Sequence, residues 1–429
     1  MKKKYRIILY TSIFLLCVVA SIILVVKKSN SVYEEESKPK VVKHKSMLSM
    51  NLEQTAGAGD YKTVTQSKWP TEGYKFNAEL SRCENGSTLS WDDTKKAVIV
   101  SGNLSDKCYV YFDIYQPTLA EYIKSQYTGT QGENNIYYHD SDLANGAGDN
   151  SYRYAGANPN NFVCFGTTES PCPTDNLYRI IGVFGENYHG VTGKQLVKLI
   201  KYDYMTTDEL GTDGDYSQTY KEWGMDSTYK GTYGDGERIG VYYWNYKATN
   251  SATNTWSTSL LNKTNLNTNF INNIGMTWAN KIATVTWKVG GNTYANISQS
   301  VPATTYQNEI VNPVTTNTTD NATTYSAKIG LMYVSDYGFA ASPDAWTLTM
   351  SSYNNTTATN NNWMYMGLYE WTISRNADSS SNAFIVLDVG NVTYNHVNDN
   401  DGVRASFSLE SSVSYVSGSG SMSDPIVIN

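Results

Sequence analysis

The segment GLMYVSDYGFAASPDAW, residues 330–346, places a Ser-Asp pair inside an otherwise apolar and aromatic stretch. Asp336 has three roles open to it there: a catalytic acid or base, a ligand contact, or a turn residue whose carboxylate accepts backbone N–H groups. No histidine lies beside it in the sequence, which argues against catalysis. The preceding KIGLMYV is typical of a core strand, so the pattern favours a turn role first and a ligand contact second.

Histidine is the usual general base at neutral pH, and it must lie within hydrogen-bond reach of a nucleophile. The chain has four histidines. His139, in YYHDSD, is the one with acidic and aromatic neighbours, so it is the candidate for catalysis, against the alternative of a loop histidine beside solvated aspartates. His44, His189 and His396 fall in predicted stalk or loop segments and are expected to be exposed. We assign no catalytic residue on this basis.

Two Asp-rich and Asn-rich loops offer the oxygen ligands that Ca²⁺ prefers. DELGTDGDYSQ and NDNDG supply the candidate metal ligands Asp213, Asp215, Asp399 and Asp401. Neither loop has the spacing of an EF-hand with its closing glutamate, and turn formation by Asp and Asn explains the same pattern without an ion. Calcium is therefore a candidate cofactor that the predicted fold does not require.

The chain contains 35 Tyr and 10 Trp, many of them beside Asn and Thr. Aromatic faces stack on sugar rings or cover apolar ligand surface, while Asn, Asp and Thr supply directional hydrogen bonds. Each tryptophan taken singly is better explained as core. Trp363 follows a polar run in NNWMYMGLYEW and is the best candidate for an exposed position. The candidate ligand-binding residues are Asp336, Tyr337, Trp346, Trp363 and Trp371.

A membrane segment precedes the elements that would position these residues. The run from Ile7 to Val26 is uncharged and mostly apolar, and at about 1.5 Å per residue it spans roughly 30 Å. It leads into Lys27 and Lys28 rather than a cleavage site, which favours an uncleaved anchor over a signal peptide. More basic residues precede than follow it. We therefore predict a single-pass protein of the cell membrane, held through residues 7–26, with a cytoplasmic N-terminus and its bulk extracellular.

The charge balance outside this span is acidic. Residues 29–429 keep 27 of the 33 basic residues and all 40 acidic ones, a net charge of −13. Binding to a phosphate backbone needs a basic face, and no basic stripe is visible in the sequence. Nucleic acid is therefore excluded as an expected partner.

The four cysteines beyond the span suit an oxidising compartment. They form two sequence-close pairs, Cys83 with Cys108 and Cys164 with Cys172. Of the three connectivities that four cysteines allow, this local one keeps each disulfide inside its own predicted domain. Free buried thiols are the alternative. Zinc is disfavoured, because neither pair has C-x-x-C spacing and no histidine flanks either.

Composition divides the chain into four parts: a cytoplasmic tip and anchor (1–28), a stalk (29–60), a small β module (61–116) and a large α+β domain (117–429). Short β-branched and aromatic segments between turn clusters predict the strands of the module, whose small core a disulfide would stabilise. In the large domain, PTLAEYIKSQY and TWSTSLLNKTNLNTNFINNI predict helices. NLYRIIGVF and KQLVKLIKY predict a hairpin.

Several motifs of residues 145–429 resemble bacterial surface domains of the C-type-lectin-like fold, in the branch related to the formylglycine-generating enzyme. YRYAGANPNNFVCF and LYRIIGVF resemble the opening strand, TWSTSLLNKTNLNTNF resembles the Trp-x-x-Ser-x-Leu motif, and GVRASFSLESSVSYVSGSGSMSDPIVI resembles the closing hairpin. Ala405 stands where that hairpin often has proline. No cysteine follows Cys172, so the oxidising activity of this branch, which uses a late thiol pair, is not carried over.

These observations predict an α+β protein with an N-terminal transmembrane helix, a small disulfide-stapled β module and a large C-type-lectin-like domain. The predicted function is extracellular binding or adhesion, with a glycan or protein ligand. Two alternatives stay open: an extracellular enzyme acting on cell-wall glycan or peptide, and a structural subunit of a surface assembly.

Overall fold

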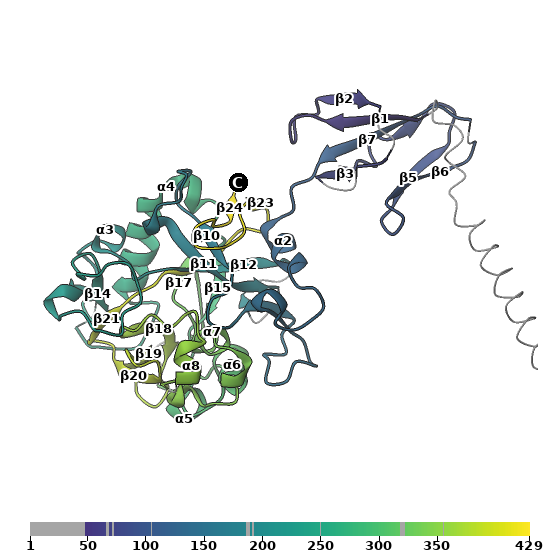
Figure 1. Cartoon of the computed structure of the whole chain (residues 1–429). Coiled ribbons are helices and arrows are strands. Elements are labelled where there is room, and N and C mark those ends of the chain that lie inside the picture. The colour runs from purple at the N-terminus through teal and green to yellow at the C-terminus, as the bar shows by residue number, and fades with distance from the viewer. Residues whose placement is uncertain are drawn as a thin grey trace, which may run out of the picture. The chain divides into compact units, whose positions relative to one another are not determined.

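The computed structural model describes residues 48–429 apart from 66–67, 71–72, 104, 186–188, 191–192, 249, 318–321 and 355. The chain divides into two compact units, Met1–Gln116 and Pro117–Asn429, called unit 1 and unit 2 below (Figure 1). Within the described residues, no helix is long and apolar enough to cross a membrane. The predicted span, residues 7–26, lies outside that range.

Unit 1 is built on a small sheet whose strands run in the order β2-β1-β7-β3, with β4 also paired to β7. Its central pair, β1 and β7, is parallel. Alternate residues of these two strands, such as Met50 and Phe112, point into one apolar core. The strands and the separate β5–β6 hairpin are β1 (Leu48–Glu53), β2 (Tyr61–Val64), β3 (Tyr74–Phe76), β4 (Arg82–Cys83), β5 (Thr88–Asp92), β6 (Ala97–Ser101) and β7 (Cys108–Ile114).

One boundary predicted for unit 1 needs correction. Residues 48–53 were expected to belong to the stalk, but they form β1 and pair with both β2 and β7. The alternation of apolar and polar residues in LSMNLE is the strand signal that a composition-based boundary at residue 60 overlooks.

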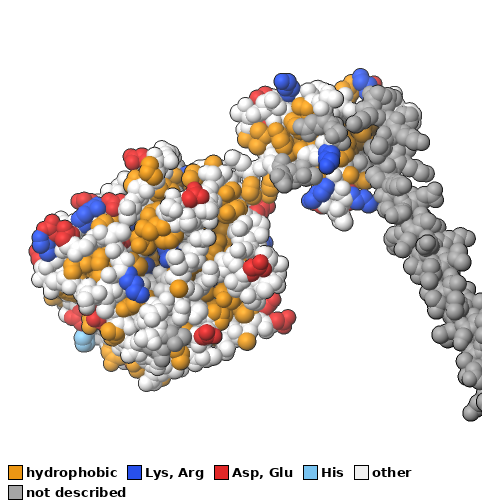
Figure 2. Space-filling model, viewed as in Figure 1, with side chains coloured by type: hydrophobic (Ala, Val, Ile, Leu, Met, Phe, Trp, Pro, Cys, Tyr) orange, Lys and Arg blue, Asp and Glu red, His pale blue; other side chains and the backbone are white. Residues whose placement is uncertain are grey.

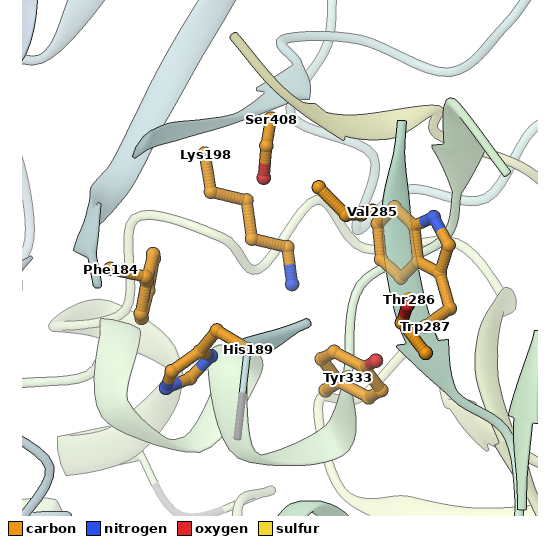
Figure 3. Close-up of a pocket in the computed structure, with 8 residues that line it drawn as sticks. All are labelled: Phe184, His189, Lys198, Val285, Thr286, Trp287, Tyr333 and Ser408. Carbon is orange, nitrogen blue, oxygen red and sulfur yellow. The ribbon is translucent and has the colours of Figure 1, made fainter. Parts of the chain in front are cut away.

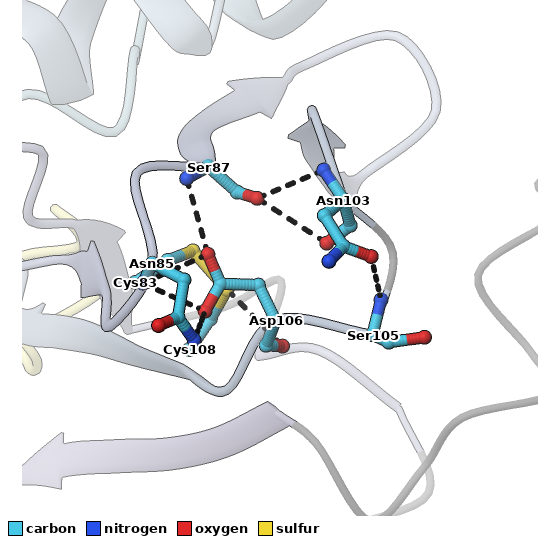
Figure 4. Close-up of a disulfide and its surroundings, with 7 residues drawn as sticks. All are labelled: Cys83, Asn85, Ser87, Asn103, Ser105, Asp106 and Cys108. Carbon is cyan, nitrogen blue, oxygen red and sulfur yellow. Dashed lines mark hydrogen bonds between the residues drawn. A yellow bond between two sulfur atoms is a disulfide. The ribbon is translucent and has the colours of Figure 1, made fainter.

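Both predicted disulfides are confirmed. Cys83 and Cys108 are register partners on β4 and β7 and are bonded to each other. Beside them, the Asp106 carboxylate accepts the backbone N–H groups of Asn85 and Ser87, which closes the loop between the two strands (Figure 4). In unit 2, Cys164 and Cys172 form the second disulfide.

Unit 2 contains a seven-stranded sheet in the order β17-β22-β12-β11-β9-β8, with β10 also paired to β11. The predicted hairpin of residues 176–184 and 194–202 is confirmed as the antiparallel pair β11–β12. All residues of this pair are buried, because helices and loops cover both faces. The strands are β8 (Ile136–His139), β9 (Ser151–Tyr154), β10 (Phe162–Cys164), β11 (Leu177–Phe184), β12 (Leu196–Lys201), β17 (Ile329–Gly330) and β22 (Ser406–Ser408).

A second sheet of six strands runs in the order β13-β14-β21-β18-β19-β20. Two further strand pairs, β15–β16 and β23–β24, complete the β structure of unit 2 among the described residues. These strands are β13 (Tyr216–Thr219), β14 (Gly240–Tyr243), β15 (Val285–Lys288), β16 (Thr324–Ala327), β18 (Glu370–Arg375), β19 (Asn382–Val386), β20 (Val392–His396), β21 (Asn400–Gly402), β23 (Tyr415–Ser417) and β24 (Val427–Ile428).

Helices are short and connect the sheets, so the predicted α+β class is confirmed. The helix predicted after Pro117 begins at a capping box of Thr118 and Glu121. Figure 1 shows α5, α6, α7 and α8 gathered at one end of unit 2. The α and π helices are α2 (Leu119–Ser125), α3 (Thr207–Leu210), η6 (Leu261–Phe270), α4 (Ile271–Ala279), α5 (Tyr294–Ile297), α6 (Pro302–Tyr306), η7 (Gln307–Val311), α7 (Val334–Ala340) and α8 (Thr356–Asn360). The 3₁₀ turns are η2 (Glu133–Asn135), η3 (Thr174–Asn176), η5 (Tyr220–Glu222), η8 (Pro343–Ala345) and η9 (Met350–Ser352).

The strand predicted over residues 328–334 is wrong over most of its length. Only Ile329–Gly330 forms a strand, β17, and the chain enters helix α7 at Val334. Asp336 explains why a helix begins here. Its carboxylate accepts the Tyr333 backbone N–H at 3.0 Å and so caps the first turn of the helix. An apolar run of this length fits a buried helix start as well as a strand.

Candidate functional site

Four charged side chains meet inside unit 2 and form what we call the charge cluster: Asp149, Arg153, Lys198 and Asp336. Arg153 on β9 binds Asp149 with Nη2 to Oδ2 at 2.7 Å, and its Nη1 lies 3.8 Å from Oδ1 of Asp336. Lys198 on β12 places Nζ 2.5 Å from Oδ2 of Asp336. None of the four side chains is more than 6 % exposed. They contrast with the charges scattered over the visible surface of unit 2 (Figure 2).

The charges in this cluster alternate in sign, which is the arrangement that buried ions require. Burial alone would raise the pKa of Asp149, but the Arg153 guanidinium and a hydrogen bond from His189 outweigh it and hold the pKa well below its usual value. Burial lowers the pKa of Lys198, against the opposing attraction of Asp336. The cluster is therefore a set of mutually dependent charges, in which removal of one member leaves another unpaired.

A pocket opens beside this cluster. Lys198 and Ser408 are register partners on β12 and β22, so their side chains leave the same face of the sheet. Figure 3 shows Lys198 extending into the middle of the pocket, with Ser408 above it and His189 and Tyr333 below. The free space between the side chains is about that of one water molecule. The lining residues are Phe184, His189, Lys198, Val285, Thr286, Trp287, Tyr333 and Ser408.

His189 and Ser408 each place beside this pocket one polar atom that forms no hydrogen bond with another described residue. His189 Nε2 lies 2.7 Å from Oδ2 of Asp149. Burial, together with the charges of Arg153 and Lys198, lowers the pKa of His189 although Asp149 raises it. Because Asp149 is ionised, we assign the ring proton to Nε2, which leaves a lone pair on Nδ1. In the described part of the chain, no hydrogen bond engages Nδ1 of His189 or Oγ of Ser408. The pocket therefore offers an acceptor and a hydroxyl between aromatic walls.

The predicted ligand-binding residues lie inside unit 2, not on its surface. Exposures are 3 % for Asp336, 1 % for Tyr337, 0 % for Trp346, 3 % for Trp363 and 0 % for Trp371. The expectation of an exposed Trp363 is wrong. Each indole N–H donates to a backbone carbonyl, as Trp363 does to Tyr154 at 2.9 Å, so these rings are anchored in the core. Asp336 belongs to the charge cluster and caps a helix, where a turn after a strand was expected.

The candidate calcium ligands do not converge. The buried Asp215 carboxylate accepts the backbone N–H groups of Leu260 and Leu261, which explains its position without an ion. Asp213 accepts a hydrogen bond from a neighbouring amide side chain, Asp399 sits on a partly exposed turn, and Asp401 is buried on β21. Among the described residues, no group of three or more His, Cys, Asp or Glu side chains is arranged to hold a metal ion.

Two histidines lie where the sequence did not place them. His139 is fully buried on β8, where its Nδ1 accepts the Ala147 N–H at 3.1 Å and its ring packs against Phe339 and Trp346. Burial lowers the pKa of His139 to about 3, which leaves it neutral and out of reach of a substrate. His189 was expected to be exposed, but only 7 % of its side chain is, and it is the histidine that lines the pocket.

Sequence reasoning missed His189, Asp149, Arg153, Lys198 and Ser408 as a group. A signal for part of it was present: charged residues interrupt otherwise apolar strands in SYRY and LVKLIK. A charge inside a buried strand needs a partner, and the partner's identity depends on the fold.

Comparison with known proteins yields no relative. No family model, curated protein or solved structure matches the chain. The resemblance to C-type-lectin-like domains therefore stays a prediction from its short motifs, and the function has to be argued from the pocket and the charge cluster.

Proposed function

We propose that unit 2 is an extracellular binding domain whose pocket receives a hydroxyl group of a glycan or of a protein ligand. The observation that carries this proposal is a pair of polar atoms in one pocket, His189 Nδ1 and Ser408 Oγ, to which no other described residue is hydrogen-bonded. A ligand hydroxyl donates to the imidazole lone pair and accepts from the serine hydroxyl. The proposal also keeps the anchor at residues 7–26 and an extracellular location, in keeping with the two disulfides.

Aromatic side chains form the walls of the pocket and limit what can enter it. Trp287 and Tyr333 form one side and Phe184 another (Figure 3). These rings are at most 5 % exposed, so they contact only the group that enters the pocket and not the face of a sugar ring outside it. Because the free space is about that of one water molecule, only a single protruding group enters, and the rest of the ligand lies outside. Selection then depends on the polar pair, since an analogue lacking the hydroxyl leaves both buried groups unpaired.

A glycan array probed with the whole chain, with and without calcium, tests this proposal. Saturable binding is expected, and Ser408→Ala should weaken it about fivefold to tenfold, because one hydrogen bond is lost. His189→Phe keeps a ring but removes Nδ1 and should have a similar effect. The matched control is His396→Phe, at an exposed position of β20. Binding that both pocket variants leave unchanged would refute the pocket as the site.

A hydrolytic enzyme is the second candidate, because Asp149, His189 and Ser408 combine an acid, a base and a hydroxyl. Catalysis requires the base within about 3 Å of the nucleophile. Among the described residues no hydrogen bond joins Ser408 to His189, so the geometry favours binding. Labelling by a fluorophosphonate probe that Ser408→Ala abolishes would reverse this preference, and an unlabelled chain would support it.

A further inference from the structure

The contact between Lys198 and Asp336 brings a primary amine against a carboxyl group inside the protein. Nζ lies 2.5 Å from Oδ2, and the two side chains are only 6 % and 3 % exposed. The pair joins the middle of strand β12 to the first turn of helix α7, 138 residues apart in the sequence. Surface ion pairs are mobile and hydrated, whereas this one is held in a single arrangement away from bulk water.

The surroundings of Lys198 hold the amine against the carboxyl. Its Nζ lies 4.3 Å from the centre of the Tyr333 ring and 5.2 Å from that of Trp287. Glu309 fixes the other partner, because its carboxylate accepts the N–H groups of Val334 and Ser335, directly before Asp336 in α7. Both reacting groups are thus positioned before any reaction, which removes much of the entropic cost of a bimolecular step.

The same surroundings favour the neutral amine that a condensation needs. An amine attacks only when it has lost its proton, and burial lowers the pKa of Lys198. Loss of the ammonium charge costs less in a low-dielectric interior than it does in water. One hydrogen-bond donor and one positive charge lie beside the carboxyl oxygens, on which negative charge develops: the Tyr333 N–H is 3.0 Å from Oδ2, and Arg153 Nη1 is 3.8 Å from Oδ1.

We propose that Lys198 and Asp336 condense into an intramolecular amide bond. The Nζ lone pair forms a bond to Cγ of Asp336, the bond from Cγ to one carboxyl oxygen breaks, and that oxygen leaves as water with two protons, both supplied by the lysine ammonium group. No oxidant, reductant or co-reactant is needed. The pocket beside Nζ has room for about one water molecule and opens to solvent, which gives the product a way out.

This bond ties the central sheet of unit 2 to helix α7 by a covalent link. It leaves Nδ1 of His189 and Oγ of Ser408 in the pocket, so ligand binding and cross-linking are independent. A chain that binds no glycan can still carry the amide, and a chain without the amide can still bind.

Intact-mass spectrometry of the whole chain tests the proposal directly. Once the hydrogens lost in the two disulfides are subtracted, the measured mass is expected to be lower than the sequence mass by one water molecule. Trypsin cannot cleave after an acylated lysine, so digestion should release residues 195–201 joined to residues 329–375. A full sequence mass together with free peptides 195–198 and 329–375 would overturn the proposal.

Two controls distinguish the water lost in forming this bond from water lost elsewhere in the chain. Lys198→Arg keeps a cation opposite Asp336 but cannot form the amide, so its mass should equal the sequence mass. If it still lacks one water, the loss comes from succinimide formation at an Asp-Gly step such as Asp235, and the proposal fails. Lys201, paired with Glu209 at 2.7 Å, is the internal comparison, because Glu209 is 14 % exposed. A linked peptide through Lys201 in place of Lys198 would equally contradict the assignment.

Discussion

Asp401 offers a direct test of how burial controls charge in unit 2. It lies on β21, directly opposite Tyr242 of β14, and is 1 % exposed. Its carboxyl accepts one side-chain hydrogen bond, from Asn395 at 3.3 Å, and within the described residues it forms no ion pair. Burial, together with the nearby charge of Asp399, raises its pKa from 3.8 to about 7.

The direction of the effect on stability follows from this shift. The folded protein keeps the Asp401 proton up to about pH 7, whereas the unfolded chain releases it near pH 4. The stabilising contribution is therefore complete below pH 4 and is lost as the pH rises through 7. The pKa difference corresponds to at most about 4 kcal/mol. Asp401→Asn cannot ionise, so its stability relative to the wild type should increase between pH 4 and 7 and then level off.

Urea unfolding followed by tryptophan fluorescence, repeated from pH 4 to pH 8.5, measures this difference. Subtracting wild type from variant at each pH cancels the titration of all other groups. Asp399→Asn, on the same loop but partly exposed, removes only the smaller of the two causes that raise the pKa of Asp401, so it should give a much smaller difference in the same direction. If the Asp401→Asn difference is flat across this range, the buried carboxyl does not hold its proton and the reasoning is wrong.

Three further predictions test the disulfide, the buried histidine and the buried ion pair. The Cys83→Ser/Cys108→Ser double variant should destabilise unit 1 by about 3.5 kcal/mol in urea unfolding, because the disulfide closes a 25-residue separation. His139 has a folded pKa of about 3, below its ordinary 6.5, so the stability present above pH 6.5 is lost as the pH falls towards 3. The His139→Leu variant should therefore lose less of its free energy of unfolding than the wild type over the same fall in pH. Arg404→Met leaves Glu370 unpaired in the core and should cost about 3–5 kcal/mol. Arg238→Met, at an exposed pair, should cost under about 1 kcal/mol in the same thermal or urea assay.

The features that the sequence predicted correctly are local ones. The β11–β12 hairpin joins neighbouring segments. Pro117 and the capping box of Thr118 and Glu121 mark the start of helix α2 in the sequence. The disulfides link cysteines 25 and 8 residues apart. In each case a short window of sequence contains both the interacting groups and the reason for their interaction.

The charge cluster could not be predicted in this way. Its ion pair between Lys198 and Asp336 spans 138 residues, and its hydrogen bond between His189 and Asp149 spans 40. Tertiary packing brings these groups together, for example by placing α7, which carries Asp336, against the sheet that carries Lys198. The same limitation explains the misplaced tryptophans: Trp363 follows a polar run, but its indole donates inward to Tyr154, 209 residues away. Local polarity describes the neighbours of a residue in sequence, not the side on which the chain packs.

The charge cluster itself favours a role beyond stability. Replacing a buried set of ions by apolar residues of similar size is often neutral or stabilising, so ion pairs such as Arg153–Asp149 and Lys198–Asp336 are weak evidence of a stability role. A binding role predicts that the cluster serves the pocket by holding His189 in one tautomer through Asp149. A cross-linking role predicts that the cluster positions Lys198 and Asp336 to form the amide bond. Because only the amide lowers the mass of the chain by one water, an intact-mass measurement decides whether the cluster has the cross-linking role, and the glycan array decides the binding role separately.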